Sequence, residues 1–506
     1  CGTVFATAGS SPPVGGKMKS HARTLLLEVA VSIYKDACAK SSADHPDLRD
    51  IKTLLSRVEN EGLSFLTMTL PDFGKDFDKS LSVGRIDSKD FRSFRKFRSI
   101  PAFLQGMVSR VFDVDTGRIH EEPDYGSIES VRQIVYAFKK VLIDCSKQKI
   151  DTAIDEFAQI EHELKRPLPS DDIEDFVLVA RVLWGSVFNR DFNPYYDTVP
   201  KHGPGATAEG ISGNRKYLHK SWHDRLEPFF PYIETAYASA SASLSEEALD
   251  VTVMSEEEEL PVKVTPVPKT LRGPRIIAIE PVCMQYAQQA ISKYIVDVLE
   301  ANRLTRGHVN FHDQSINRRL AILSSRDRSL ATLDLSSASD RVPLSLATRM
   351  FDSDPDLRDS ILACRSTRAR LPNGDILPLD KFASMGSALC FPVESMYFYT
   401  LCVGALLKMH NLPVAYRNIL KVSRSVYVYG DDIIVPTEAA EFVINHLQKY
   451  YCKVGTTKSH WIGKFRESCG ADAYDGELVT PVYVRQLPPD GKQASTALIS
   501  WVSTAN

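Results

Sequence analysis

Apolar residues recur at helical spacing through much of the first 200 residues. This spacing predicts helices over Leu25–Lys35, Ile128–Cys145 and Ile173–Val187, because residues three and four apart share one face of a helix. Ser127 stands just before the second of these segments and is predicted to be its N-cap. The N-terminal half is therefore expected to be mostly helical.

One segment of this half combines aromatic and basic residues. In Phe91–Arg98, phenylalanine recurs every third residue, and arginine, lysine and serine fill the positions between. The favoured interpretation is an amphipathic helix whose Phe91, Phe94 and Phe97 face the core. The alternative is one wall of an RNA channel, in which aromatic rings stack on bases and arginines contact phosphates.

In the C-terminal half, two short apolar runs flank a pair of carboxylates. Ser425–Val428 leads into Tyr429-Gly430-Asp431-Asp432, and Ile433–Pro436 leads out. Valine, isoleucine and tyrosine favour strands, whereas Gly followed by Asp favours a reversal, so the pattern predicts a hairpin with both carboxylates at its tip. Taken alone, these four residues favour the alternative of a solvated surface turn, which leaves the carboxylates in water.

A further carboxylate lies at the end of an earlier strand. Leu330–Leu335 is a short apolar run that contains Asp334, and Asp340 follows in a run of small polar residues. A lone Asp after a strand is usually a helix cap. If this strand packs beside the hairpin, however, three carboxylates converge and supply the oxygen ligands that a pair of Mg²⁺ ions requires. Such a pair can activate a 3′-hydroxyl and stabilise a leaving pyrophosphate, which is the chemistry of nucleotidyl transfer.

A small, flexible loop, Ala383–Ala388, lies between the two carboxylate segments and leads into an apolar helix predicted over Leu389–Met409. Gly386 permits close backbone approach to a ligand, and the flanking Ser384 and Ser387 offer hydroxyl groups. A plain loop-to-helix junction with serine caps is the equally weighted alternative.

Upstream, Pro268–Arg275 holds three cations in a stretch stiffened by proline: Lys269, Arg272 and Arg275. Such a clamp suits a triphosphate, because the planar guanidinium group pairs with phosphate oxygens. Charge runs are more often solvated faces, and the consecutive glutamates in Ser255–Glu259 are interpreted in that way.

Composition neither establishes nor excludes this chemistry. The 506 residues carry 61 Lys and Arg against 64 Asp and Glu, for a net charge of −3, which argues against a protein that coats nucleic acid non-specifically. The 9 cysteines include no Cys-x-x-Cys pair, so neither a zinc motif nor a disulfide framework is indicated. No apolar run approaches the roughly 18–20 residues of a membrane span, and no membrane association is expected.

Taken in order, these motifs resemble the RNA-dependent RNA polymerases of single-stranded RNA bacteriophages, the catalytic subunits of levivirus replicases. The resemblance covers the chain from about residue 200 to residue 485, and several motifs in one order are far more specific than any one of them. It rests on segments that keep this order: Pro268–Arg275 with Ile277–Pro281, His312–Asn317, Asp334–Asp340, Ser384–Gly386, Tyr429–Ile434, Phe465–Gly470 and Thr480–Arg485.

The resemblance implies roles for the carboxylates and for one lysine. Asp334 and Asp431 would be the main ligands of two Mg²⁺ ions, or of Mn²⁺, with Asp432 in support. Lys458, in a lysine-bearing segment after the hairpin, would protonate pyrophosphate, and Lys453 and Lys464 are alternatives for that role. The Phe465–Gly470 turn would support the end of the growing strand.

The resemblance also implies a nucleotide-binding set. Asp340 would hydrogen-bond the ribose 2′-hydroxyl with help from the Ser384–Ser387 loop, including Gly386, although family members often carry asparagine in place of Ser387. The three cations of the basic stretch, Lys269, Arg272 and Arg275, would hold the triphosphate.

The fold implied is a right-hand polymerase of α+β type, with fingers, a palm built on an antiparallel sheet, and a thumb. The expected divisions are a disordered segment at 1–17, a helical N-terminal and fingers region at 18–200, fingers with the basic stretch at 201–330, a palm at 331–464, and a palm–thumb junction with a truncated thumb at 465–506, where Lys492–Val502 begins a helix. His202–Thr207 also resembles the family, without an assigned physical role.

The activity implied is RNA-templated RNA synthesis in the cytoplasm of a bacterial host. The expected partners are RNA template and product, NTPs, host translation elongation factors and a ribosomal protein.

Three other functions remain open. A mitovirus or narnavirus polymerase shares these motifs, and only Phe465–Arg485 favours the phage group. A reverse transcriptase shares the paired aspartates but generally has a bulky residue near the first aspartate motif, where this chain has Ser339 and Asp340. An RNA-binding structural protein would use the Asp pair as a surface turn.

Overall fold

The computed structural model describes residues 16–41, 46–237, 250–455, 457–489 and 493–505. The expected disordered segment 1–17 lies outside these residues, except for Gly16 and Lys17, which begin the first helix.

Helices dominate the N-terminal part of the chain, as expected. Between the first helix and Asp197, the described strands are only β1 (Lys96–Phe97) and β2 (Ile100–Pro101). The helices are α1 (Gly16–Lys40), α2 (Leu48–Glu61), the π-helix η1 (Phe65–Thr69), α3 (Leu70–Val83), α4 (Gln105–Val108), α5 (Tyr125–Tyr136), α6 (Lys147–Leu164), α7 (Ser170–Gly185) and α8 (Pro194–Asp197).

Helix α5 is shorter than predicted, because tertiary contacts take over its C-terminal end. It ends at Tyr136 rather than at Cys145, and the carbonyl of the next residue, Ala137, accepts a hydrogen bond of 2.8 Å from the N–H of Val484. Its N-cap is Asp124 rather than Ser127: the Asp124 carboxylate accepts from the Ser127 N–H at 3.0 Å.

The Phe91–Arg98 segment is not a helix, so that prediction is wrong. Phe91 has a left-handed φ of 58°, and its N–H donates to the Asp76 carboxylate at 2.7 Å, which interrupts helical geometry. Phe91 and Phe94 are buried in the core as predicted, but Phe97 is 45% exposed.

The second half of the chain contains both of the four-stranded sheets that the structure describes. The antiparallel sheet β10-β11-β7-β12 contains β7 (Leu330–Ser336), β10 (Tyr427–Tyr429), β11 (Asp432–Pro436) and β12 (Lys453–Val454). The sheet β6-β5-β8-β9 contains β5 (Val262–Thr270), β6 (Gly273–Ile279), β8 (Arg368–Arg370) and β9 (Ile376–Pro378). The antiparallel sheet and the α+β class agree with expectation.

Helices pack around the first sheet and fill the largest core. They include α12 (Val282–Ala301), α15 (Pro355–Ala363), α16 (Cys390–Met409), α17 (Tyr416–Ser423) and α18 (Ala440–Lys449). Helix α13 (Ser315–Asp327) lies outside this core and packs against β7. In the part of the chain that the structure describes, α16 is the one helix long and apolar enough to cross a membrane, which corrects the expectation that no run approaches that length. Its apolar window is 94% buried inside the protein, as for a central core helix.

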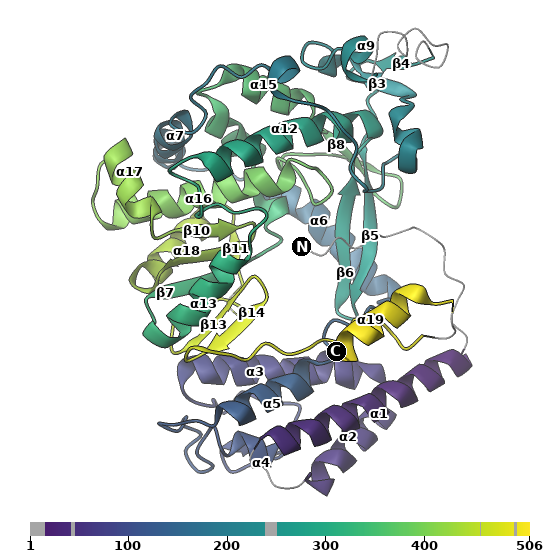
Figure 1. Ribbon diagram of the computed structural model, residues 1–506, viewed down its shortest axis with the longest axis vertical. Coiled ribbons are helices and arrows are strands. Elements are labelled where there is room, and N and C mark those ends of the chain that lie inside the picture. The colour runs from purple at the N-terminus through teal and green to yellow at the C-terminus, as the bar shows by residue number, and fades with distance from the viewer. Residues whose placement is uncertain (1–15, 42–45, 238–249, 456, 490–492, 506) are drawn as a thin grey trace.

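The long β5–β6 hairpin reaches from the upper helices down to the N-terminal helices (Figure 1). At its tip, the Arg272 guanidinium pairs with Asp72 of α3 at 2.6 Å. The hairpin thus faces the first sheet across the middle of the molecule, with the N-terminal helices below both (Figure 1).

The chain then returns to the N-terminal helices. Phe465 of β13 (Phe465–Ser468) and Tyr474 of β14 (Ala471–Tyr474) belong to the N-terminal core, and the buried Arg132 of α5 bonds both Asp78 and Asp472. The remaining elements here are β15 (Glu477–Leu478) and α19 (Ser495–Ala505), which covers most of the helix expected over Lys492–Val502, although Lys492 itself lies outside the described residues.

Candidate active site

The two carboxylate segments meet in the first sheet. In the antiparallel β7–β11 pair, Asp334 lies directly opposite Asp432, and the β10–β11 register closes Tyr429 on Asp432 with Gly430 and Asp431 forming the turn. Gly430 has φ +59°, a conformation that glycine adopts without strain. Both the hairpin and its packing beside the earlier strand are therefore confirmed.

Helix α16 supports this turn. The Gly430 N–H donates to the Ser395 hydroxyl at 3.2 Å, and a Cβ at Gly430 would lie 2.3 Å from the ring of Phe391. The turn thus sits on the N-terminal half of α16, and a side chain at Gly430 would push it away.

Burial and neighbouring negative charge raise the pKa of two of the carboxylates. Burial raises the pKa of Asp432 to about 7, with further contributions from the Asp431 and Asp334 charges. Burial also raises the pKa of Asp334, with Asp431 adding to the shift and Lys458 opposing it. Acidic groups held together in this way would be stabilised by a divalent cation, which favours their ionised forms.

The donor set has the chemistry of a Mg²⁺ site, but the side chains are not drawn together as a cluster. Among the residues described, no group of three His, Cys, Asp or Glu side chains is close enough to hold a metal ion. Asp334 Oδ1 instead accepts from Lys458 Nζ at 2.8 Å, and Asp432 Oδ1 lies 3.4 Å from the Ser468 hydroxyl. The predicted convergence of three carboxylates on one metal site is therefore not found among the described residues, although the charges of Asp431 and Asp334 contribute to the raised pKa of Asp432.

Lys458 contacts one of the candidate metal-binding carboxylates, Asp334, directly. Burial alone would lower the pKa of Lys458, but the Asp334 carboxylate raises it above its usual value. Of the alternatives, Lys464 donates to Asp475 at 2.6 Å, and Lys453 is an exposed residue of β12 opposite Ser336. The contacts single out Lys458 among the three.

The three basic residues of the β5–β6 hairpin separate into two groups. Burial lowers the pKa of Lys269, as do the charges of Arg275 and Lys458, whereas Asp431 and Asp334 oppose the shift. Lys269 therefore lies in the electrostatic field of the carboxylates, and Arg275 lies close enough to Lys269 to help lower its pKa. Arg272 lies at the hairpin tip, where it pairs with Asp72 and donates to the Met68 carbonyl at 2.9 Å.

The loop before α16 brings a hydroxyl to Asp340. The Ser384 hydroxyl donates to Asp340 Oδ1 at 2.9 Å, as the sequence-based pairing of this loop with Asp340 requires. Ser387 points elsewhere: its hydroxyl donates to the Gln288 side chain at 3.1 Å and accepts from the Leu389 N–H at 3.3 Å. Ser387 therefore bonds within the loop-to-helix junction, and among the described residues helix α16 has no side-chain cap.

Gly386 allows the loop backbone to pack closely against a strand of the protein, rather than against a ligand as predicted. Its φ is +132°, and a Cβ there would lie 2.0 Å from the carbonyl oxygen of Ala278 in β6. The Ala278 N–H donates to the Met385 carbonyl at 2.9 Å. The loop is thus bonded to the strand that follows the basic stretch.

Comparison with known proteins matches the same part of the chain. The family model described as "RNA replicase, beta-chain" matches residues 230–490, just over half of the chain. The chain belongs to the RNA replicase beta-chain family. The resemblance to the single-stranded RNA phage replicases is thereby confirmed.

Relatives in the family come from single-stranded RNA phages. The RNA-directed RNA polymerase subunit beta of Qbeta virus (strain MX1) is 31% identical over 290 residues, 57% of this chain and 46% of that protein. The RNA-directed RNA polymerase beta chain of Escherichia phage MS2 is 34% identical over 220 residues, 44% of this chain and 37% of that protein. The chain thus spans less than half the length of these relatives.

A solved structure was also matched: the crystal structure of the RNA-dependent RNA polymerase of a human picorbirnavirus, at 12% identity. The match has a TM-score of 0.36 and covers 48% of this chain and 52% of the other.

Sequence reasoning missed several buried charges around the site of this replicase-family chain. Glu394 is the one acidic residue of the apolar helix α16, and burial, followed by the Asp431 and Asp340 charges, raises its pKa well above the usual range. Lys381 and Glu161 are fully buried beside Asp340. A lone acid in an otherwise apolar helix is a signal that could have revealed Glu394. No local pattern marks the other two.

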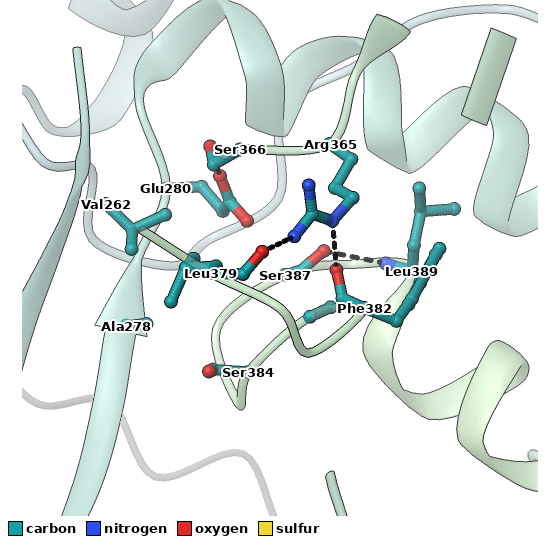
Figure 2. A pocket seen from close by; sticks show the side chains of 11 residues that line it. Val262, Ala278, Glu280, Arg365, Ser366, Leu379, Phe382, Ser384, Ser387 and Leu389 are labelled. Atoms are coloured by element: carbon teal, nitrogen blue, oxygen red, sulfur yellow. Dashed lines mark hydrogen bonds between the residues drawn. The ribbon is translucent and has the colours of Figure 1, made fainter. Parts of the chain in front are cut away.

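Behind the Ser384–Ser387 loop lies a cavity of about 10 Å³, the size that holds a single water. Figure 2 shows the Arg365 guanidinium beside it, donating to the carbonyls of Leu379 and Phe382 at 2.6 and 2.8 Å. Glu280, which lines the same cavity, accepts from the Ser366 hydroxyl at 2.5 Å. The loop is therefore backed by a nearly solid, hydrogen-bonded wall.

Proposed function

We propose that this chain carries the nucleotidyl-transfer centre of an RNA-directed RNA polymerase, which extends an RNA 3′-hydroxyl with NTPs on an RNA template and so replicates a positive-strand phage genome. The observation that carries the proposal is the β7–β11 register, which sets Asp334 against the Asp431-Asp432 turn. Lys269 and Lys458 share the field of these carboxylates.

The carboxylates are the proposed metal ligands. Asp334 and Asp431 are the proposed main ligands of a Mg²⁺ pair, for which Mn²⁺ could substitute, and Asp432 supports them. When bound, the cations would lower the pKa of the attacking 3′-hydroxyl and neutralise charge on the phosphates. Lys458, which now donates to Asp334, would be available to the substrate if Asp334 held a cation instead.

Cationic residues would hold the triphosphate. Lys269, which lies in the field of the carboxylates, and the neighbouring Arg275 on the β5–β6 hairpin suit this role. Arg272 would have to leave Asp72 in order to join them, so its contribution is the weakest of the three. Lys458 is the proposed proton donor to the leaving pyrophosphate, since it is a cation already beside Asp334.

The sugar is proposed to be read by Asp340, with Ser384. A carboxylate beside the ribose can accept a hydrogen bond from a 2′-hydroxyl, which a deoxynucleotide lacks. This favours an RNA polymerase over a reverse transcriptase. The membership in the replicase family favours the phage group over mitoviruses and narnaviruses, and the seated turn on α16 argues against a plain surface turn in a non-catalytic RNA-binding protein.

The test is primer extension on an RNA template with Mg²⁺, comparing ribonucleotides with deoxynucleotides for the wild type and Asp431→Ala. The proposal expects ribonucleotide incorporation that Asp431→Ala abolishes. Undiminished incorporation by the variant would refute the metal assignment, and a preference for deoxynucleotides would identify a reverse transcriptase.

The proposed partners beyond RNA and NTPs are bacterial translation elongation factors and a ribosomal protein, met in the host cytoplasm. Binding of the purified factors to the immobilised chain, measured with and without RNA, would test this association.

A further inference from the structure

We infer that Lys381, held by Glu161 and Phe157 of α6, positions Asp340 so that one of its oxygens faces the ribose 2′-hydroxyl. The inference rests on the proposed function and names the device that sets its sugar specificity. Asp340 would touch the substrate, whereas Lys381 and Glu161 would act through it.

The Lys381 ammonium is buried between two carboxylates and an aromatic ring. Its side chain is 0% exposed, and Nζ lies 3.0 Å from Asp340 Oδ1, 3.0 Å from Glu161 Oε1 and 3.5 Å from the centre of the Phe157 ring. A buried ammonium is costly unless it is paired, so each of these contacts restrains its position. Phe157 and Glu161 are four residues apart and therefore share one face of α6.

In this arrangement, only one of the two carboxylate oxygens of Asp340 accepts hydrogen bonds from the described part of the protein. Both donors to its carboxylate, Lys381 Nζ and the Ser384 hydroxyl, meet at Oδ1, at 3.0 and 2.9 Å. Within the described ranges, Oδ2 has no recorded donor, and the side chain is 17% exposed. Two donors on one oxygen fix the orientation of the carboxylate and leave the second oxygen for an incoming hydroxyl.

The backbone that carries Lys381 is held from both sides. Glu161 Oε2 accepts from the N–H groups of Asp380 and Lys381, at 2.6 and 3.2 Å. On the other side, Arg365 donates to the carbonyl of Lys381 at 2.8 Å, as it does to those of Leu379 and Phe382 (Figure 2). Glu161 thus fixes both the side chain and the main chain of Lys381, which is more than a simple counter-ion would do.

The consequence is that a helix of the N-terminal region takes part in choosing the sugar. With Lys381 in place, a deoxynucleotide leaves the oriented Asp340 oxygen without its donor, which penalises binding. Without Lys381, the carboxylate is free to rotate, and the penalty falls. If Lys381 had a purely structural role, its substitution would instead weaken the binding of both nucleotides equally.

The experiment measures equilibrium binding of GTP and 2′-deoxy-GTP to the whole chain with template RNA, and reports the ratio of the two affinities. The variants are Lys381→Met, Glu161→Gln, Asp340→Ala and the double variant Lys381→Met with Asp340→Ala. Asp78→Asn is the matched control, because Asp78 is a buried partner of Arg132 outside this site. Thermal melting of each variant reports folding.

We expect Lys381→Met to reduce the ribonucleotide preference about tenfold or more, the effect of losing a charge-assisted hydrogen bond. Glu161→Gln, which retains the Lys381–Asp340 pair, should reduce it by less. In the Asp340→Ala background, Lys381→Met should cause no further change, because the two act through one carboxylate. Asp78→Asn should lower the melting temperature and leave the ratio unchanged.

A wild-type preference retained by Lys381→Met or, if that variant does not fold, by Glu161→Gln would overturn the inference. So would equal binding of GTP and 2′-deoxy-GTP by the wild type, or additive effects in the double variant. Because binding is measured apart from catalysis, a failure of the proposed function appears separately, as absent incorporation by a chain that still prefers GTP.

Discussion

Asp334 of β7 accepts a hydrogen bond from Lys458 at 2.8 Å, across the sheet edge at which Asp432 faces Asp334. The lysine and the carboxylate are thereby coupled: each stabilises the charged form of the other. This coupling places an acid and a metal-ligand candidate side by side at the centre of the proposed reaction.

Lys458→Ala is expected to lower the single-turnover rate of nucleotide incorporation by about 100-fold, within the range for loss of a general acid. Lys464→Ala is the matched control, since Lys464 pairs with Asp475 instead. Rates should be measured from pH 6 to 10, and the wild-type loss of rate at high pH should be absent from Lys458→Ala. Equal effects of the two substitutions would contradict the assignment.

Asp432 makes stability depend on pH. Its pKa is raised from an ordinary value near 3.8 to about 7, so the folded state binds the proton more tightly than the unfolded state does. The favourable contribution of Asp432 to the free energy of unfolding is therefore present below about pH 4 and is lost as the pH rises through about 7. Melting temperatures at pH 5 and pH 8 should show a smaller decline for Asp432→Asn than for the wild type. Parallel declines would refute the shift.

Mg²⁺ should stabilise the folded chain, because it relieves the repulsion among the carboxylates. At about 100 times the dissociation constant, a ligand specific for the folded state adds about 2.7 kcal/mol to the free energy of unfolding. The rise in melting temperature on Mg²⁺ addition should disappear in Asp334→Asn and in Asp431→Asn, and EDTA should reverse it in the wild type. The exposed Asp356 provides the control: Asp356→Asn should respond like the wild type.

Gly386→Ala should destabilise the loop that carries Ser384. The new Cβ would lie 2.0 Å from the Ala278 carbonyl at a φ of +132°, so a clash adds to backbone strain, at a total cost of about 3 kcal/mol or more. Gly374→Ala isolates the strain, because Gly374 has φ +97° with open space around it, and should cost about 1 kcal/mol. Chemical denaturation gives both values, and equal costs would show that the close approach is unimportant.

Much of the site could be predicted from the sequence, because its signals are local. The Asp431 turn and the Asp334 strand are short apolar runs with polar ends, and their order along the chain resembles one family. Strand pairing then brought them together, as the β7–β11 register shows. The helices over Leu25–Lys35 and Ile173–Val187 followed from periodicity in the same way.

The remainder depends on contacts between distant segments. Helix α5 ends early because the Ala137 carbonyl pairs with Val484, and Arg272 turns to Asp72 because the β5–β6 hairpin reaches α3. Lys381 and Glu161 lie far apart in the chain and carry no motif. Periodicity cannot reveal such pairings, since each segment alone is an ordinary helix, strand or loop.

The central claim is that Asp334 and Asp431 act as one unit in nucleotidyl transfer. A double-mutant cycle in RNA-templated incorporation tests it, with Asp334→Ala, Asp431→Ala, the double variant, and Asp356→Ala as control. The account predicts that each single substitution lowers the rate by about 1,000-fold or more, that the double variant is no slower, and that the control matches the wild type. Full activity in either single variant, or losses that multiply in the double variant, would contradict it.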